Sequence, residues 1–505
     1  MDTNKLGIDT KIAQLVMPRI DFKDPRSLPL ARKLVKEAHI GGFIIFGGTR
    51  DSVRRATEEL RVASQIPLFF ACDAERGVGQ IVSGMTLFPF TMSLGAIDDE
   101  ELVYEQASFI AKEMKECGLN LVFGPVADVN TNPANPIINI RSFGDDPELV
   151  SRLSQAFING LQENGIMACA KHFPGHGGTW VDSHVDMPVS EQTEENLFKC
   201  DLIPFKNAVS SGVTFIMPAH IAYPKISNEK IPATISEAVI QGILRDKLGF
   251  TGLVVTDSFR MDGIGKSGDE ADMSRLALIS GCDIILDPKD PDALIKKLTQ
   301  MSESGELDSD TLTRSVTRII GVKNKWLTAE HSESTNIKQD ADSLVKTIAK
   351  HSSCLLKGGA LKSDNAIVLI FDVTESGSDI SSVFLNRMNG SVVRCKKFGV
   401  LNEDPQYILE LSEGYDAIIC LIYTTVGAWK KETSLPENYN TILNAIETLQ
   451  KEKILVSIGS PYVVSEFMNY DTVLCIFDHM DVCQAVAADV LLGKIEPTGK
   501  LSVKI

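Results

Sequence analysis

The chain has 505 residues, more than one hydrophobic core usually holds, which implies two or three domains. Its 44% hydrophobic and 23% charged residues are typical of globular proteins and exclude a fibre, a disordered chain or a disulfide-stapled mini-protein. Because 67 acidic residues against 50 basic ones leave a net charge of −17, the chain repels nucleic-acid backbones and anionic membrane surfaces. We therefore predict no nucleic-acid partner and no membrane partner.

The ten cysteines stand singly, without a C-x-x-C pair, and several lie within apolar runs. This pattern is typical of reduced, buried thiols and favours a reducing compartment. The first residues, MDTNKLGIDTKIAQ, carry charge where a signal peptide is apolar, and no window reaches the roughly 18 apolar residues of a membrane span. These features predict a soluble, cytoplasmic protein.

Short runs rich in Val, Ile and Phe recur along the first two-thirds of the chain, with helical patterns in several of the gaps. Eight such strand-helix units predict a (β/α)8 TIM-like barrel over residues 1–326, with its active site at the carboxyl ends of the strands. Polar groups follow several runs: Asp73, Asp128, Lys171 with His172, His220, Asp257 and Asp287. The predicted strands are 12–20, 41–48, 66–74, 119–129, 166–173, 213–221, 252–259 and 282–288.

A polar stretch without apolar periodicity, TAEHSESTNIKQDADS, follows Trp326 and predicts a linker over 327–343. Residues 344–505 again alternate strand and helix patterns, which predicts a smaller, open α/β sandwich domain. The expected strands there are AIVLIFDV, AIICLIYTT, KILVSIGS, TVLCIFDH and the closing KLSVKI. This part shows no Gly-rich phosphate loop, so we expect the chemistry to lie in the barrel.

The segment 171–188, KHFPGHGGTWVDSHVDMP, contains three of the eight histidines, a lysine and two aspartates among Gly and Pro. One interpretation is a solvated turn, and another is a metal site. A histidine ligand pair at this spacing needs a shared helical face, which Pro174 and Gly175 rule out for His172 and His176. Acid/base chemistry is the third interpretation. Asp182 and His184 are two apart, so in an extended segment the carboxylate can orient the imidazole for proton transfer.

Three further clusters complete the candidates. Asp257 follows an apolar strand, which suits a nucleophile, although it could instead cap the next helix. Asp73 and Glu75 alternate in CDAERG at another strand end. The Asn- and Pro-rich loop 124–147 brings Asp128 and Arg141, whose polar groups suit a neutral polyol; a surface ion pair of Arg141 with a nearby aspartate is the alternative.

These motifs resemble those of glycoside hydrolase family 3, and within it the β-N-acetylglucosaminidase branch. The matching pieces are KHFPGHG at 171–177, T-x-x-D-S-H at 179–184, PVADVN at 125–130, RSFGDDP at 141–147, VVTDS at 254–258 and the closing TGKLSVKI. The resemblance implies a retaining exo-acting hydrolase with Asp257 as nucleophile and His184, oriented by Asp182, as general acid/base. It implies that the substrate is a small carbohydrate whose sugar is bound by Asp73, Arg141, Lys171 and His172. It implies neither a metal nor an organic cofactor.

The chain departs from the family's usual pattern at two positions. Gly178 stands where an aspartate commonly follows G-H-G, and Val78 stands where an arginine commonly reaches the sugar. Both changes concern substrate preference rather than the catalytic pair. The alternatives are an N-acetylglucosaminide phosphorylase, a β-glucosidase of the same family and a non-catalytic carbohydrate-binding relative.

Overall fold

Eight parallel strands close into a barrel in the computed structural model, which describes residues 5–180, 187–265, 268–328, 340–374, 380–388, 394–398, 410–425 and 435–505. Seven strands form one sheet in the order β2-β3-β4-β5-β6-β7-β8, and β9 pairs with β1. A bridge between Val255 and Ile284 joins β8 to β9. Segments β1 and β2 are the two halves of one barrel strand interrupted at Pro18, so the nine labelled segments make eight strands and the ring closes. The strands are β1 Val16–Met17, β2 Arg19–Asp21, β3 Gly42–Phe46, β4 Phe69–Cys72, β5 Leu121–Val122, β6 Met167–Phe173, β7 Phe215–Pro218, β8 Leu253–Val254 and β9 Ile285–Leu286.

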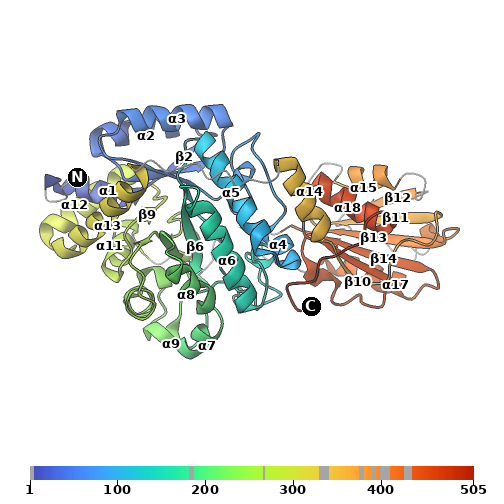
Figure 1. Ribbon diagram of the computed structural model, residues 1–505. Helices are drawn as coiled ribbons and strands as arrows, with labels where there is room; N and C mark the ends of the chain where they lie inside the picture. The colour runs from blue at the N-terminus through green and yellow to red at the C-terminus, as the bar shows by residue number, and fades with distance from the viewer. Residues whose placement is uncertain are drawn as a thin grey trace. The chain divides into compact units, whose positions relative to one another are not determined.

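Helices follow the strands and cover the barrel, with α5 and α6 lying side by side on its outside (Figure 1). This arrangement confirms the predicted TIM-like barrel. The covering helices include α2 Ser27–Lys33, α3 Arg50–Ala63, α5 Glu100–Glu116, α6 Pro147–Gln162, α7 Glu194–Lys199, α8 Leu202–Ser210, the π-helix η6 Ala238–Lys247, α11 Glu270–Ser280, α12 Pro291–Ser304 and α13 Ser309–Leu327.

The first predicted strand, 12–20, is wrong in its first half. Ile8–Gln14 forms helix α1, and the strand begins only at Val16. Residues Ile12 to Met17 are all buried, so neither a period of two nor a period of 3.6 stands out in this stretch. This mostly apolar, uniformly buried stretch therefore did not reveal where the helix ends and the strand begins.

A buried lysine lies near the amino ends of the first strands. Lys323, on α13, is completely buried, and its ammonium donates to Gln14 Oε1 at 2.7 Å and to the Gly41 carbonyl at 2.8 Å. It also lies 4.9 Å from the centre of the Phe69 ring. Burial lowers the pKa of Lys323 well below its usual value. This polar contact is at the end of the barrel opposite the strand-end candidates.

A second sheet has six strands in the order β10-β15-β14-β13-β11-β12, with only the edge strand β10 antiparallel. Alternate residues of its inner strands point to two separate apolar cores, one facing α17 and the other facing α15 and α18 (Figure 1). Helices on both faces confirm the predicted α/β sandwich. The elements are β10 Cys354–Lys357, β11 Ala366–Asp372, α15 Ser382–Arg387, β12 Arg394–Phe398, β13 Ala417–Tyr423, α17 Glu437–Glu447, β14 Glu452–Ile458, β15 Thr472–Ile476 and α18 Asp481–Leu491.

The closing KLSVKI does not form the strand that was predicted. Its backbone instead bonds to a loop of the same compact unit, because Ser502 O accepts from Asp145 N at 3.0 Å and Lys504 N donates to Asp145 Oδ2 at 2.7 Å. These hydrogen bonds take the place of the backbone pairing that a neighbouring β-strand would supply. The alternation of Leu501, Val503 and Ile505 was therefore a misleading signal.

The chain divides into two compact units. One comprises residues 1–87, 100–129 and 147–338, and the other residues 88–99, 130–146 and 339–505. Two early segments thus group with the late part of the chain; one of them contains helix α4, Thr91–Ile97. No helix in the described part of the chain combines the length and the apolarity needed to cross a membrane. Nine described cysteines are free thiols, and all but Cys200 are buried.

Candidate active site

Four predicted side chains come from the carboxyl ends of barrel strands. Asp73 follows β4, Lys171 and His172 belong to the end of β6, and Asp257 follows β8. Cys169 is buried in β6, where burial raises the pKa of its thiol well above its usual value and the charges of Lys171, Asp73 and Asp257 also act on it. The barrel therefore gathers these groups around one mouth.

Lys171 joins two carboxylates at this mouth. Its Nζ lies 2.7 Å from Asp73 Oδ1 and 2.7 Å from Glu75 Oε1. The Lys171 side chain is only 4% exposed, whereas that of Asp73 is 29% exposed. The ammonium thus fixes the Asp73 carboxylate while leaving part of it open to a ligand. A carboxylate held in this way is a directional acceptor for sugar hydroxyls.

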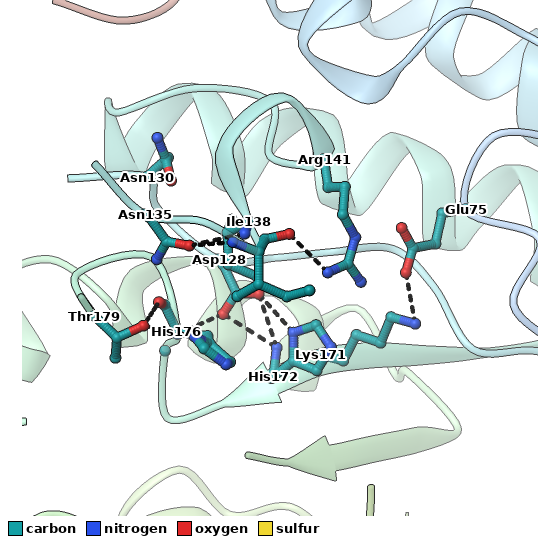
Figure 2. Close-up of polar contacts among 12 residues, drawn as sticks. Glu75, Asp128, Asn130, Asn135, Ile138, Arg141, Lys171, His172, His176 and Thr179 are labelled. Atoms are coloured by element: carbon teal, nitrogen blue, oxygen red, sulfur yellow. Dashed lines mark hydrogen bonds and ion pairs between the residues drawn. The ribbon is translucent and has the colours of Figure 1, made fainter. Parts of the chain in front are cut away.

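Asp128 is the centre of a buried network (Figure 2). Its carboxylate accepts from the backbone N–H of His172 at 3.2 Å and from that of His176 at 2.7 Å, and lies 2.7 Å from His172 Nδ1. Burial works to raise the pKa of Asp128, but the charges and hydrogen bonds of the two histidines outweigh it and keep the pKa below its usual value. Because Asp128 is completely buried, it positions the histidines and does not itself present a surface to a polyol.

His176 is held from two sides. Its Nδ1 lies 2.8 Å from Thr179 Oγ1, and that hydroxyl donates to the His176 carbonyl at 2.9 Å, so Nδ1 carries the proton and donates to Oγ1. The rings of His172 and His176 meet edge to face, with centroids 5.7 Å apart. The start of the histidine-rich loop is therefore ordered by side-chain contacts.

Asp201 lies beneath this loop and was not predicted. It directly precedes α8 and is buried, and its Oδ2 has no hydrogen-bond partner among the described residues. Gly175, with φ +143°, packs so closely on it that an added Cβ would lie 2.7 Å from Asp201 Oδ1. Burial and the neighbouring charge of Asp128 raise the pKa of Asp201 to about 7. In the sequence Asp201 looks like an ordinary helix cap, so no local pattern marked it.

Asp201→Asn is expected to remove part of the pH dependence of stability. The folded protein binds this proton more tightly than the unfolded chain, so the stabilisation present below the unfolded pKa of 3.8 is lost as pH rises through about 7. Between pH 5.5 and 8 the wild type should lose about 2 kcal/mol more than the variant. Denaturant unfolding at both pH values measures this difference; identical losses would contradict it, and Asp246→Asn, at an exposed site, is the control.

Asp257 is partly exposed at the mouth. Its Oδ1 accepts the Ser258 N–H at 2.7 Å, and the next helix, α10, begins only at Asp262. Asp257 is therefore not the cap of that helix, which was the alternative interpretation. The following segment is braced by His220, whose Nε2 lies 3.2 Å from the Ser258 carbonyl. A partly exposed carboxylate held after a barrel strand suits a nucleophile at the mouth.

The other three predicted site residues are Asp182, His184 and Arg141. Asp182 and His184 fall in 181–186, outside the described residues. Arg141 ends the short helix η4, Asn139–Arg141, in a loop that groups with the second compact unit, where its Nη1 donates to the Ile137 carbonyl at 2.9 Å. Within the described ranges, no group of three or more His, Cys, Asp or Glu side chains is placed to hold a metal ion.

Comparison with known proteins agrees with the motifs. Residues 7–322 match the model of the glycosyl hydrolase family 3 N-terminal domain. The chain is 34% identical over 330 residues to beta-hexosaminidase A of Pseudoalteromonas piscicida, covering 59% of this chain and 55% of that protein. It is 37% identical over 280 residues to a beta-hexosaminidase of Thiobacillus denitrificans, covering 53% of this chain and 77% of that protein.

A solved structure is similar over almost the whole chain. It is a glycoside hydrolase family 3 beta-N-acetylglucosaminidase from Paenibacillus sp. str. FPU-7, with a TM-score of 0.85 and 29% sequence identity. The alignment covers 99% of both chains. The two-domain architecture is therefore shared in full, whereas this chain spans only about half the length of the Pseudoalteromonas relative.

Proposed function

The chain belongs to glycosyl hydrolase family 3, as its motifs predicted, and from this premise we propose that it is a retaining, exo-acting β-N-acetylglucosaminidase. The observation that carries the proposal is that Asp257 and the Lys171–Asp73 ion pair all stand at the carboxyl ends of strands of one parallel barrel. The relatives named beta-hexosaminidase and the Paenibacillus β-N-acetylglucosaminidase support N-acetylglucosamine as the sugar that is released. We assign catalysis to residues 1–326 and treat 344–505, after the 327–343 linker, as the second domain.

In the first proposed step, Asp257 attacks the anomeric carbon while the glycosidic bond breaks. His184, oriented by Asp182, gives its proton to the departing oxygen, so the leaving group departs neutral and a glycosyl ester forms on Asp257. Retaining enzymes usually use a second carboxyl group for this proton, and a histidine departs from that pattern.

In the second step, water attacks the same carbon and the ester bond breaks. His184 takes a proton from the water, and Asp257 leaves as a carboxylate. Two inversions at one carbon restore the β configuration. Asp73, Lys171, His172 and Arg141 are proposed to bind the sugar hydroxyls, with Asp128 holding His172 in place. These steps use side chains of this chain alone.

An aryl-glycoside panel with and without phosphate tests this function. We expect release of N-acetylglucosamine from its 4-nitrophenyl β-glycoside, with kcat/KM at least about 100-fold above that for the matching glucoside. Sugar 1-phosphate as the main product would instead establish a phosphorylase, and a glucoside preference would establish a β-glucosidase. Absence of turnover on every glycoside would favour a carbohydrate-binding relative and contradict the proposal.

The location proposed from the sequence is the cytoplasm. Its support is the set of free cysteines, eight of the nine described ones being buried. Burial raises the pKa of several of these thiols, for example that of Cys354 to about 12, so they are poor nucleophiles for disulfide exchange.

A further inference from the structure

A cavity of about 640 Å³ opens at the ends of the first and last barrel strands, and the proposed steps do not use it. It lies where β2 runs into α2 and where β9 runs into α12. Its charged lining comes from residues far apart in the sequence, four of them basic and three acidic. These are Arg19, Arg26, Arg260, Lys289, Asp21, Asp24 and Asp290.

Two of the arginines share one buried carboxylate. Asp287 is completely buried, and its Oδ1 accepts from Arg19 Nε at 2.7 Å and from Arg260 Nε at 3.1 Å. Its Oδ2 accepts from Arg19 Nη2 and, at 2.8 Å, from Ser258 Oγ. One negative charge thus holds two guanidinium groups in fixed positions, so their geometry is set before any ligand arrives.

Each guanidinium keeps donors that Asp287 does not use. Arg260 Nη2 donates to the carbonyls of Pro288 and Lys289 at 3.3 Å, and the Nη1 group of either arginine has no hydrogen-bond partner within the described ranges. The side chains are 31% exposed for Arg19 and 40% exposed for Arg260, so these donors can meet a ligand. Paired N–H groups of this kind match the two oxygens of a carboxylate or phosphate.

The acidic residues of the lining are engaged locally. Asp24 pairs with Arg26, Asp290 accepts from Ala293 N at 3.0 Å at the start of α12, and Asp21 accepts from Lys23 N at 2.9 Å. Counting Asp287, four cations face four carboxylates, so the lining as a whole is neutral. Recognition of a ligand would therefore depend on the directed donors of Arg19 and Arg260 rather than on a long-range field.

We propose that this cavity is an oxyanion-binding site in which Arg19 and Arg260 bind a carboxylate or phosphate group. The site borders the catalytic mouth, because Ser258 directly follows Asp257 and donates to the carboxylate that holds both arginines. Two sources supply such a group: a carboxylate on the leaving group of the glycoside, or free phosphate. The first source rests on the proposed hydrolase function, and the second does not.

Single variants of the full chain separate these sources. Arg19→Gln and Arg260→Gln each leave Asp287 with one arginine and Ser258, so the buried carboxylate stays paired, and unchanged melting temperatures would verify folding. Arg32→Gln is the matched control, an exposed arginine on α2 that pairs with Glu59 outside the cavity. The readouts are calorimetric titration with inorganic phosphate and kcat/KM for 4-nitrophenyl and 3-carboxy-4-nitrophenyl β-N-acetylglucosaminides.

If the leaving group carries the oxyanion, the ratio of kcat/KM for the carboxylated over the neutral glycoside falls at least about tenfold in both variants and stays unchanged in Arg32→Gln. If free phosphate is the ligand, that ratio is constant, and the Kd for phosphate rises at least about tenfold in both variants. An unchanged ratio together with unchanged or absent phosphate binding overturns the site. Lack of hydrolysis by the wild type contradicts the proposed function. The calorimetric titration with phosphate then tests by itself whether the cavity binds an oxyanion.

Discussion

Replacing Asp257 by alanine is expected to lower kcat/KM for an aryl β-N-acetylglucosaminide by roughly 10³- to 10⁵-fold. The variant lacks the carboxylate that forms the glycosyl ester, so the reaction loses its covalent route. The fold should persist, since Asp257 is partly exposed and accepts a local hydrogen bond from its neighbour Ser258. Steady-state kinetics at equal protein concentration measure the loss.

Azide distinguishes a missing nucleophile from a general disturbance. The small anion can enter the space left by the side chain and attack the anomeric carbon directly, giving the α-glycosyl azide by one inversion while His184 still protonates the leaving group. We expect activity to rise at least about tenfold with azide in Asp257→Ala and not in Asp272→Asn, a control at a partly exposed site in α11. Wild-type activity in Asp257→Ala would refute the assignment.

The second large effect is expected at Asp128. An asparagine there keeps one acceptor oxygen but replaces the other by an amide NH2. The backbone N–H groups of His172 and His176 are donors, so an N–H group that faces the NH2 loses its acceptor. Removing one partner of a buried ion pair lowers the free energy of unfolding by about 3 to 5 kcal/mol. Displacing His172 and the loop from their productive positions should also lower kcat/KM by about 100-fold.

Two measurements separate positioning from folding at Asp128. Denaturant unfolding gives the stability change, and kinetics well below the variant's own melting temperature give the activity of folded protein. A loss of stability with full activity in the folded fraction would show that Asp128 is structural only. Asp51→Asn, at an exposed site in the first turn of α3, should change neither quantity.

The strand-end rule accounts for most of what the sequence predicted at the site. Asp73 and Asp257 follow apolar strands, and Lys171 and His172 lie at the end of another. A parallel barrel brings such ends to one mouth whatever their separation in the chain. The interpretation of Asp128 was incomplete. Its place after β5 was correct, but the sequence did not reveal that it is completely buried and faces two histidines.

Features that depend on tertiary contacts were not predicted. Asp201 carries a common helix-start residue type, and only the packing of Gly175 above it shows that its carboxyl group is buried. The sharing of Asp287 by Arg19 and Arg260 joins residues up to 268 positions apart. No local pattern links them, because closure of the barrel alone makes the first and last strands neighbours.

The proposed function depends on a covalent bond between Asp257 and the sugar, and one measurement tests for that bond directly. The wild-type enzyme is incubated with 5-fluoro-β-N-acetylglucosaminyl fluoride, whose fluorides allow the ester to form but slow its hydrolysis, and is then digested for peptide mass spectrometry. We expect one added sugar on the peptide that contains Asp257, at the Asp257 side chain. A sugar on a different residue, or rapid turnover of the fluoride to the α anomer without any adduct, would contradict it.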